Sequence, residues 1–258
     1  MVQPATRGRI RVEWPVMKHS LTVAAATLGA LAAPATASAI VADIGKPATQ
    51  IPAACPGKPC LAVSRTTGFQ AKEGDSRAVD VVPQDGRIVA WSITLSDPGA
   101  KQTKFFNENL GGEAVAQLTV VRPGRKLYYR VIAQGEPQKL TPYFGQTVQF
   151  PLEKSIPVKK GMVIGLSVPT WAPALGVNQP GTTSWRASRK KGTCDDFSSA
   201  TAQTGVNNVT RFYCLYRTAR LLYSATLVTD PQPTGKQPTA TTTPTTTTPT
   251  TTTTAPGT

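Results

Sequence analysis

The sequence predicts an all-β fold, a two-sheet β-sandwich that is jelly-roll-like, with about nine strands and disordered termini. Three observations predict it. Short runs of alternating or continuous apolar residues recur along the middle of the chain, turns rich in Gly, Pro and Asp separate them, and no segment keeps a 3.6-residue period for more than two helical turns. Many short strands without long helices are typical of sandwiches and barrels.

The strands are expected within residues 51–229, which we predict to form a single β-sandwich domain. Pro123 and Gly124 form a turn between two of the runs and predict a hairpin there. Residues 101–110 (KQTKFFNENL) are expected to form either a short helix or a loop that packs Phe105 and Phe106. In chain order, the runs interpreted as strands are Leu61–Gln70, Ala78–Val82, Ile88–Ser96, Val115–Arg122, Lys126–Gln134, Gln146–Leu152, Met162–Pro169, Thr182–Ser188, Arg211–Tyr216 and Ala219–Thr229.

Residues 1–39 have the organisation of a secretory signal peptide. After Met17, Lys18 supplies a positive charge, residues 21–33 are uncharged and apolar or small, and residues 37–39 (ASA) are an A-x-A cleavage signal. The apolar run is too short to span a membrane, which takes about 20 residues. Residues 1–16 are either an extended n-region or lie upstream of a true start at Met17. We favour the second reading, because Met17 alone begins a complete signal.

Residues 230–258 are predicted to be a disordered tail rich in Thr and Pro. They contain no apolar residues able to form a core, so nothing offsets the entropy lost on ordering. Such tracts are typical of O-glycosylated stalks, and an unmodified disordered tail is the alternative. Residues 40–50, between the signal peptide and the domain, are expected to be a linker.

Four cysteines, an even number in an exported chain, predict two disulfides. Four cysteines allow three pairings, of which the local one is the simplest, Cys55 with Cys60 and Cys194 with Cys214. A metal site is not expected, because the spacing is not that of zinc ligands and no histidine accompanies the cysteines.

The composition argues against several familiar chemistries. The one histidine, His19, lies in the signal peptide, so a mature chain has no histidine for a catalytic triad or a metal site. Ser188 and Lys191 match the S-x-x-K pattern of a Ser/Lys dyad, but its companion motifs are missing and a solvated basic loop is the better interpretation. Paired carboxylates, as in a glycoside hydrolase, remain an alternative that the sequence does not place. No cofactor, metal ion or catalytic residue is predicted.

The charge suggests an anionic partner. The chain has 28 Lys and Arg against 14 Asp and Glu, a net of +14, and removing residues 1–39 takes away four basic residues and one acid and leaves +11. Trp171, in a Pro-flanked segment, is the aromatic ring expected to be most exposed, since loops carry binding residues more often than core strands do. The candidate ligand-binding residues are Trp171, Trp185, Tyr129, Arg186, Arg189, Lys190 and Lys191.

The mature region resembles uncharacterised secreted β-sandwich proteins of high-GC actinobacteria. The stretches that carry the resemblance cover most of residues 51–229: IPAACPGKPCLAVSRTTGFQ, DGRIVAWSITL, KLTPYFGQTVQFPLEKSIPVKKGMVIGLSVPTWAPAL and CLYRTARLLYSATLV. The resemblance implies an exported β-sandwich and assigns no activity and no catalytic residue.

We therefore expect a secreted, non-enzymatic domain of the cell envelope or extracellular space that binds a cell-wall glycan or another anionic polymer. The alternatives are a carboxylate-dependent glycoside hydrolase and a structural envelope protein without a small ligand. No motif for sequence-specific nucleic-acid binding is present, no transmembrane segment is expected in the mature chain, and the sequence does not indicate an oligomeric state.

Overall fold

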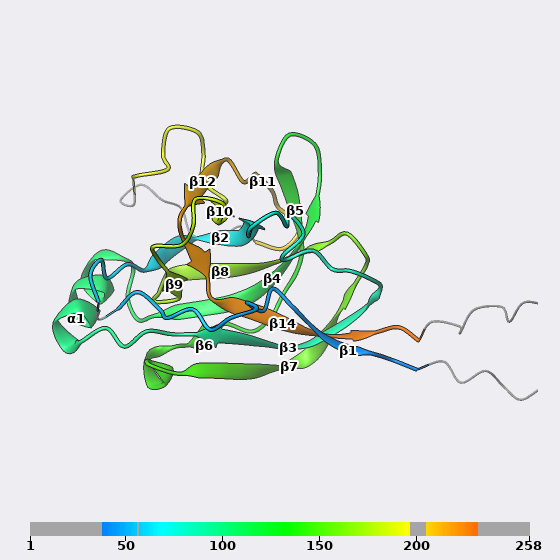
Figure 1. The fold of residues 1–258 in the computed structure, drawn as a ribbon, viewed down its shortest axis with the longest axis horizontal. Helices are drawn as coiled ribbons and strands as arrows, with labels where there is room; N and C mark the ends of the chain where they lie inside the picture. The colour runs from blue at the N-terminus through cyan, green and yellow to red at the C-terminus, as the bar shows by residue number, and fades with distance from the viewer. Residues whose placement is uncertain (1–37, 56, 197–204, 232–258) are drawn as a thin grey trace, which may run out of the picture. The chain divides into compact units, whose positions relative to one another are not determined.

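The structure is a computed structural model that describes residues 38–55, 57–196 and 205–231. Nearly all of the expected signal peptide and tail lie outside these residues. Strands dominate the described part of the chain, and the single α-helix there is α1 (Ala100–Asn109) (Figure 1). The prediction of an all-β sandwich is confirmed. The described residues contain fourteen strands, whereas about nine were expected. Several of the strands are only two to four residues long, too short to show a recognisable sequence pattern.

One sheet is antiparallel and has four strands. Their order is β1 (Val41–Ile44), β14 (Tyr223–Thr229), β3 (Gly86–Thr94) and β7 (Thr147–Val158). In β14 every second residue is buried, including Tyr223, Ala225 and Leu227, so one face of the sheet covers the core and the other meets water. The prediction that residues 40–50 are a linker is wrong for part of this range. Val41 pairs with Val228, and β1 is a strand of the sheet.

The second sheet is longer and curls. Its order is β11 (Val209–Arg211), β5 (Tyr128–Gln134), β4 (Val115–Pro123), β8 (Val163–Ala172), β2 (Val63–Lys72), β10 (Ser184–Ala187) and β12 (Cys214–Arg217), with β6 (Gln138–Lys139) paired to β4. A separate pair joins β9 (Leu175–Gly176) and β13 (Arg220–Leu221). A short 3₁₀-helix, η1 (Thr141–Tyr143), precedes β7.

The main core fills the space between the two sheets. It includes Trp91 and Ile93 from the four-stranded sheet and Leu118, Ile164 and Leu166 from the curled sheet, all almost completely buried. Six consecutive residues of β4 (116–121) and six of β8 (163–168) are buried, because the curled sheet also encloses a second apolar cluster on its other face. The buried stretches also contain polar residues, namely Gln117 and Thr119 in β4 and Ser167 in β8.

The expected local disulfides are both present, Cys55–Cys60 and Cys194–Cys214. Of the two structures expected for residues 101–110, the helix is present as α1, with Phe106 buried and Phe105 exposed. In the part of the chain that the structure describes, no helix is long and apolar enough to cross a membrane.

Candidate anionic-ligand site

The curled sheet is almost closed by a two-residue connection. Strands β11 and β12 are its first and last strands, and only Phe212 and Tyr213 separate them in sequence. The backbone N–H of Phe212 donates a hydrogen bond to the carbonyl of Leu127, 2.9 Å away, which ties this connection to the entrance of β5. We call Phe212–Tyr213 the strap. It makes the sheet a half-barrel, and β11 and β12 lie close together in Figure 1.

An apolar cluster lies inside the half-barrel. The buried residues are Phe69 from β2, Val121 from β4, Val131 from β5, Val163 from β8 and Phe212 from the strap. Phe69 lies against the ring of Phe212 with centroids 5.3 Å apart. Mouths of β-barrels are preferred sites for ligands, because they combine an apolar floor with a small number of polar groups.

The opening of the half-barrel, called the mouth here, is a hollow of about 390 Å³ with a strongly basic rim. Phe69, Tyr129 and Leu215 supply apolar surface, and Thr182 and Ser184 add hydroxyl groups. No described carboxylate lines it. The cations that line it are Lys72, Arg77, Arg186 and Arg217.

Arg186 is the most deeply placed of these cations. Its Nη1 donates hydrogen bonds to the strap carbonyls of Phe212 and Tyr213, at 3.3 and 3.1 Å. Burial lowers the pKa of Arg186, and burial raises the pKa of Tyr129, an effect that the charge of Arg186 partly offsets. The guanidinium therefore carries its charge in a partly desolvated position, where an anionic ligand interacts with it more strongly than in water.

A second hollow, of about 590 Å³, is called the outer hollow and is lined by Tyr213 of the strap. In it the Arg211 guanidinium lies over the rings of Tyr128 and Tyr213, with its central carbon 5.8 and 5.2 Å from the ring centroids. The described residues that line it include no acid. Its other lining residues are Ser188, Arg189, Lys190, Lys191, Thr193, Val209 and Thr210.

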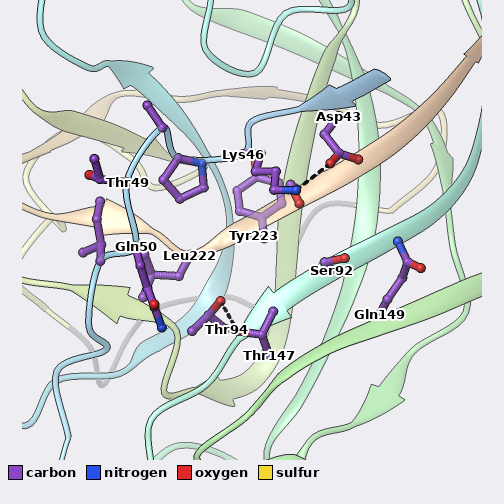
Figure 2. Close-up of a pocket in the computed structure, with 14 residues that line it drawn as sticks. Asp43, Lys46, Thr49, Gln50, Ser92, Thr94, Thr147, Gln149, Leu222 and Tyr223 are labelled. Carbon is purple, nitrogen blue, oxygen red and sulfur yellow. Dashed lines mark hydrogen bonds and ion pairs between the residues drawn. The ribbon is translucent and has the colours of Figure 1, made fainter. Parts of the chain in front are cut away.

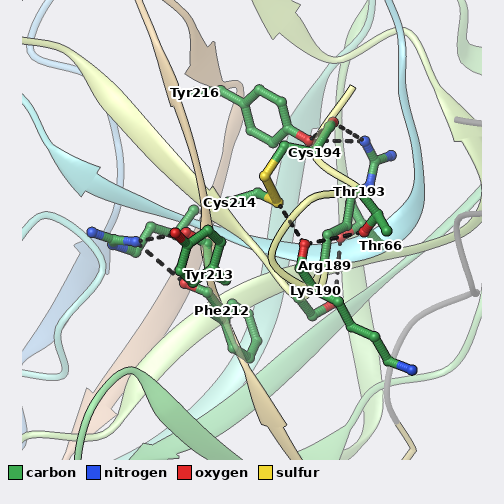
Figure 3. Close-up of a disulfide and its surroundings, with 11 residues drawn as sticks. Thr66, Arg189, Lys190, Thr193, Cys194, Phe212, Tyr213, Cys214 and Tyr216 are labelled. Carbon is green, nitrogen blue, oxygen red and sulfur yellow. Dashed lines mark hydrogen bonds between the residues drawn. A yellow bond between two sulfur atoms is a disulfide. The ribbon is translucent and has the colours of Figure 1, made fainter. Parts of the chain in front are cut away.

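The Cys194–Cys214 disulfide directly follows the strap, with Cys214 next to Tyr213 (Figure 3). It fixes the start of β12 to the loop that carries Lys190 and Lys191. Arg189, which is 5 % exposed, donates from Nη2 to the carbonyl of Ser64 at 2.7 Å and from Nη1 to the hydroxyl of Tyr216 at 2.8 Å. Arg189 therefore organises the loop, while the Lys190 side chain extends away from the disulfide in Figure 3.

Two of the predicted binding residues are buried and do not reach either hollow. Trp171 is 0 % exposed and Trp185 is 5 % exposed, so the prediction that Trp171 presents an open ring is wrong. Trp171 packs on Phe106 of α1, with centroids 4.8 Å apart, and its indole N–H donates to the side chain of Asn107. Trp185 stacks on Tyr216 at 4.5 Å. Both rings are core residues.

The remaining predicted residues do gather at the half-barrel. Tyr129 and Arg186 line the mouth, and Arg189, Lys190 and Lys191 line the outer hollow. Lys72, Arg77 and Tyr213 were not singled out by sequence reasoning, since they join the site only when the sheet curls. Within the described residues, the ion pairs of Lys46, Lys104, Lys139, Lys159 and Arg220 all lie outside the two hollows.

A third hollow, on the four-stranded sheet, is different in character (Figure 2). It has a volume of about 340 Å³ and is mostly neutral, with hydroxyl and amide groups from β3, β7 and β14. Its one carboxylate, Asp43, forms an ion pair with its one cation, Lys46, at 3.1 Å. Thr94 and Thr147 hydrogen-bond to each other across β3 and β7 at 2.8 Å. Its charges are already paired, so it is a weaker candidate for an anionic ligand.

The geometry offers no support for the hydrolase alternative. Five prominent hollows on the described residues are each lined by at most one carboxylate, whereas glycoside hydrolysis uses two that face each other. In the same part of the chain, no group of three or more His, Cys, Asp or Glu side chains is arranged to hold a metal ion.

Comparison of the chain with models of protein families, with curated proteins and with solved structures found no match. The functional argument therefore depends on the geometry of the half-barrel alone.

Proposed function

We propose that this protein is an extracellular binding protein whose half-barrel mouth holds an acidic glycan. The observation that carries the proposal is the mouth itself: four cations surround an apolar floor, and no described carboxylate lines it. Salt bridges between the protein's own side chains would leave little charge for a ligand, but the described ion pairs lie elsewhere. The arrangement is complementary to a negatively charged partner.

The hydroxyl groups around the mouth favour a sugar polymer as the partner. Thr182 and Ser184 lie beside Arg186 and Arg217 at this opening. Hydroxyl side chains both donate and accept hydrogen bonds, as sugar hydroxyls do. The extracellular location is supported by the two disulfides, which persist in oxidising compartments.

The test is retention of the full chain on immobilised heparin, a sulfated glycan, and on a neutral glucan, at low and at high salt. We expect retention on heparin that falls as salt rises, because screening weakens contacts between exposed charges. We expect none on the glucan. Absence of retention on heparin at low salt would contradict the proposal.

A matched pair of variants locates the site. Arg77→Gln with Arg217→Gln removes two cations from the mouth rim, and Lys101→Gln with Lys154→Gln removes two exposed cations from α1 and β7. Exposed ion pairs contribute up to about 1 kcal/mol each, so the loss of two should weaken heparin binding by several-fold to about thirtyfold. The control variant should bind as the unaltered chain does. Equal losses in the two variants would mean that net charge, and not the mouth, determines binding.

A further inference from the structure

The mouth and the outer hollow lie on the two sides of one thin partition. Arg186 lines the mouth and donates to the carbonyl of Tyr213, while Tyr213 itself lines the outer hollow. Strand β5 contributes a residue to each hollow, with Tyr129 lining the mouth and Tyr128 lining the outer hollow. The two basic hollows are therefore neighbours, with the strap and β5 between them.

The partition is held firmly, so the two hollows keep a fixed relation. Arg186 ties the strap from the mouth side, and the Cys194–Cys214 disulfide holds the end of the strap at β12. Phe212 is completely buried in the half-barrel and anchors the strap from below. A ligand that fits both hollows meets a prepared surface and loses little free energy in ordering it.

Each hollow alone offers what an acidic sugar unit needs. The mouth combines Arg77, Arg186 and Arg217 with hydroxyl groups, and the outer hollow combines Lys190 and Lys191 with the hydroxyls of Ser188, Thr193 and Thr210. The exposed cations Lys190, Lys191 and Arg217 form no ion pair with another described residue. Two such places side by side match a chain in which charged units repeat.

The rings of the outer hollow favour a glycan over a single-stranded nucleic acid. Bases bind by stacking on open aromatic faces. Here the Arg211 guanidinium lies over one face of both Tyr128 and Tyr213, although Tyr128 is 45 % exposed. Beside these rings the hollow presents the charges of Lys190 and Lys191, which suit sulfate or carboxylate groups.

We propose that the mouth and the outer hollow are two subsites for successive acidic groups of one linear acidic glycan, which crosses the strap. This inference rests on the proposed function and adds that the ligand is recognised as a chain and not as a single charged sugar. When two acidic groups belong to one glycan chain, binding of the first group makes binding of the second intramolecular. The affinity should therefore rise with chain length by more than the number of acidic groups alone would give.

The test is calorimetric titration of the full chain with heparin-derived oligosaccharides of defined length. We expect two disaccharides per protein chain, one for each subsite, and one octasaccharide per chain, bound at least about tenfold more tightly than a disaccharide after correction for the number of units. An affinity that grows only with the number of units, or two octasaccharides on one chain, would overturn the two-subsite inference and leave the proposed function intact. No binding of any length would overturn both.

Variants separate the subsites. Lys190→Gln with Lys191→Gln should reduce the disaccharide stoichiometry to one and remove most of the gain with length, while the remaining disaccharide still binds in the mouth. The Lys101→Gln with Lys154→Gln control should keep both. A length gain that survives in the Lys190 and Lys191 variant would contradict the assignment of the outer hollow. A single-stranded oligonucleotide of the same charge that binds more tightly than the octasaccharide would contradict the choice of an acidic glycan.

Discussion

The buried carboxyl of Asp80 should make the protein more stable in mild acid than at neutral pH. Asp80 is 2 % exposed, and its Oδ2 accepts hydrogen bonds from the backbone N–H of Gln70 and the hydroxyl of Tyr223, both at 2.6 Å. Its Oδ1 has no hydrogen-bond partner among the described residues. Burial raises the pKa of Asp80 from 3.8 to about 6, although these bonds and the nearby charge of Arg220 lower it; the charge of Glu73 adds to the increase.

The magnitude follows from the difference in pKa between the folded and unfolded chains. Each pKa unit corresponds to about 1.4 kcal/mol, so ionising Asp80 costs the folded state about 3 kcal/mol relative to the unfolded state. Between about pH 4 and pH 6 the unfolded chain releases this proton and the folded chain keeps it. The free energy of unfolding therefore falls as the pH rises through this window, by about 3 kcal/mol from this group alone.

The neutral carboxyl also has a satisfied arrangement. A proton on Oδ2 can be donated to the Tyr223 hydroxyl, which in turn donates to the carbonyl of Ile164, 3.1 Å away. The ionised form lacks this second bond, since the single Tyr223 proton then points to Asp80. The structure thus accommodates the protonated form at least as well as the charged one.

The assay is denaturant unfolding of the unaltered chain and of Asp80→Asn from pH 4 to pH 8. The variant cannot ionise, so its free energy of unfolding, relative to the unaltered chain, should rise by about 3 kcal/mol between pH 4 and pH 7. Asp85→Asn is the control with the opposite sign. Hydrogen bonds from the backbone of Lys160 and the side chain of Lys159 lower the pKa of Asp85, so its contribution is present at neutral pH and lost in acid. Parallel pH profiles for Asp80→Asn and the unaltered chain would refute the reasoning.

Three further predictions concern stability. Gly86→Ala should destabilise the four-stranded sheet strongly, because a Cβ there would lie 2.3 Å from the backbone carbonyl oxygen of Val228; thermal unfolding should show a marked loss, and an unchanged midpoint would contradict the packing described. Replacing Cys194 and Cys214 with Ser opens a loop with a sequence separation of 20 and should cost about 3 kcal/mol in the free energy of unfolding, an effect that a reducing agent should reproduce on the unaltered chain. Trp171→Phe removes a buried donor with two acceptors and should cost about 1–3 kcal/mol while leaving heparin retention unchanged; weaker retention at equal folding would restore that ring to the binding site.

The sequence predicts the class of fold well and the binding surface in part. Alternation in the run that became β14, and the apolar-rich runs that became β4 and β8, are local signals and need no knowledge of partners. The disulfides follow from spacing in the same way. The strand Val41–Ile44 is not predicted from the sequence. It has no clear pattern of its own and forms by pairing with β14, more than 180 residues away.

The errors at the site have a similar cause. Trp171 stands between prolines, which suggests a loop, yet it belongs to β8 and packs against the rings of Phe106 in α1 and Phe144. Lys72 and Arg217 are far apart in the sequence and face one hollow only because β2, β10 and β12 pair side by side. Sequence reasoning located the basic loop at Lys190, since its charges are contiguous, and it missed the cations that the curl of the sheet brings together.

The pairing of β1 with β14 has a mechanical consequence. These strands are neighbours in the four-stranded sheet, and Val41 lies opposite Val228, so the chain enters and leaves the domain about one strand spacing apart (Figure 1). A force that separated the two ends would pull β1 away from β14 one hydrogen bond at a time, as a zipper opens, instead of shearing the whole pair at once. The domain should therefore yield first at this edge, at low force, while the half-barrel on the other sheet remains folded.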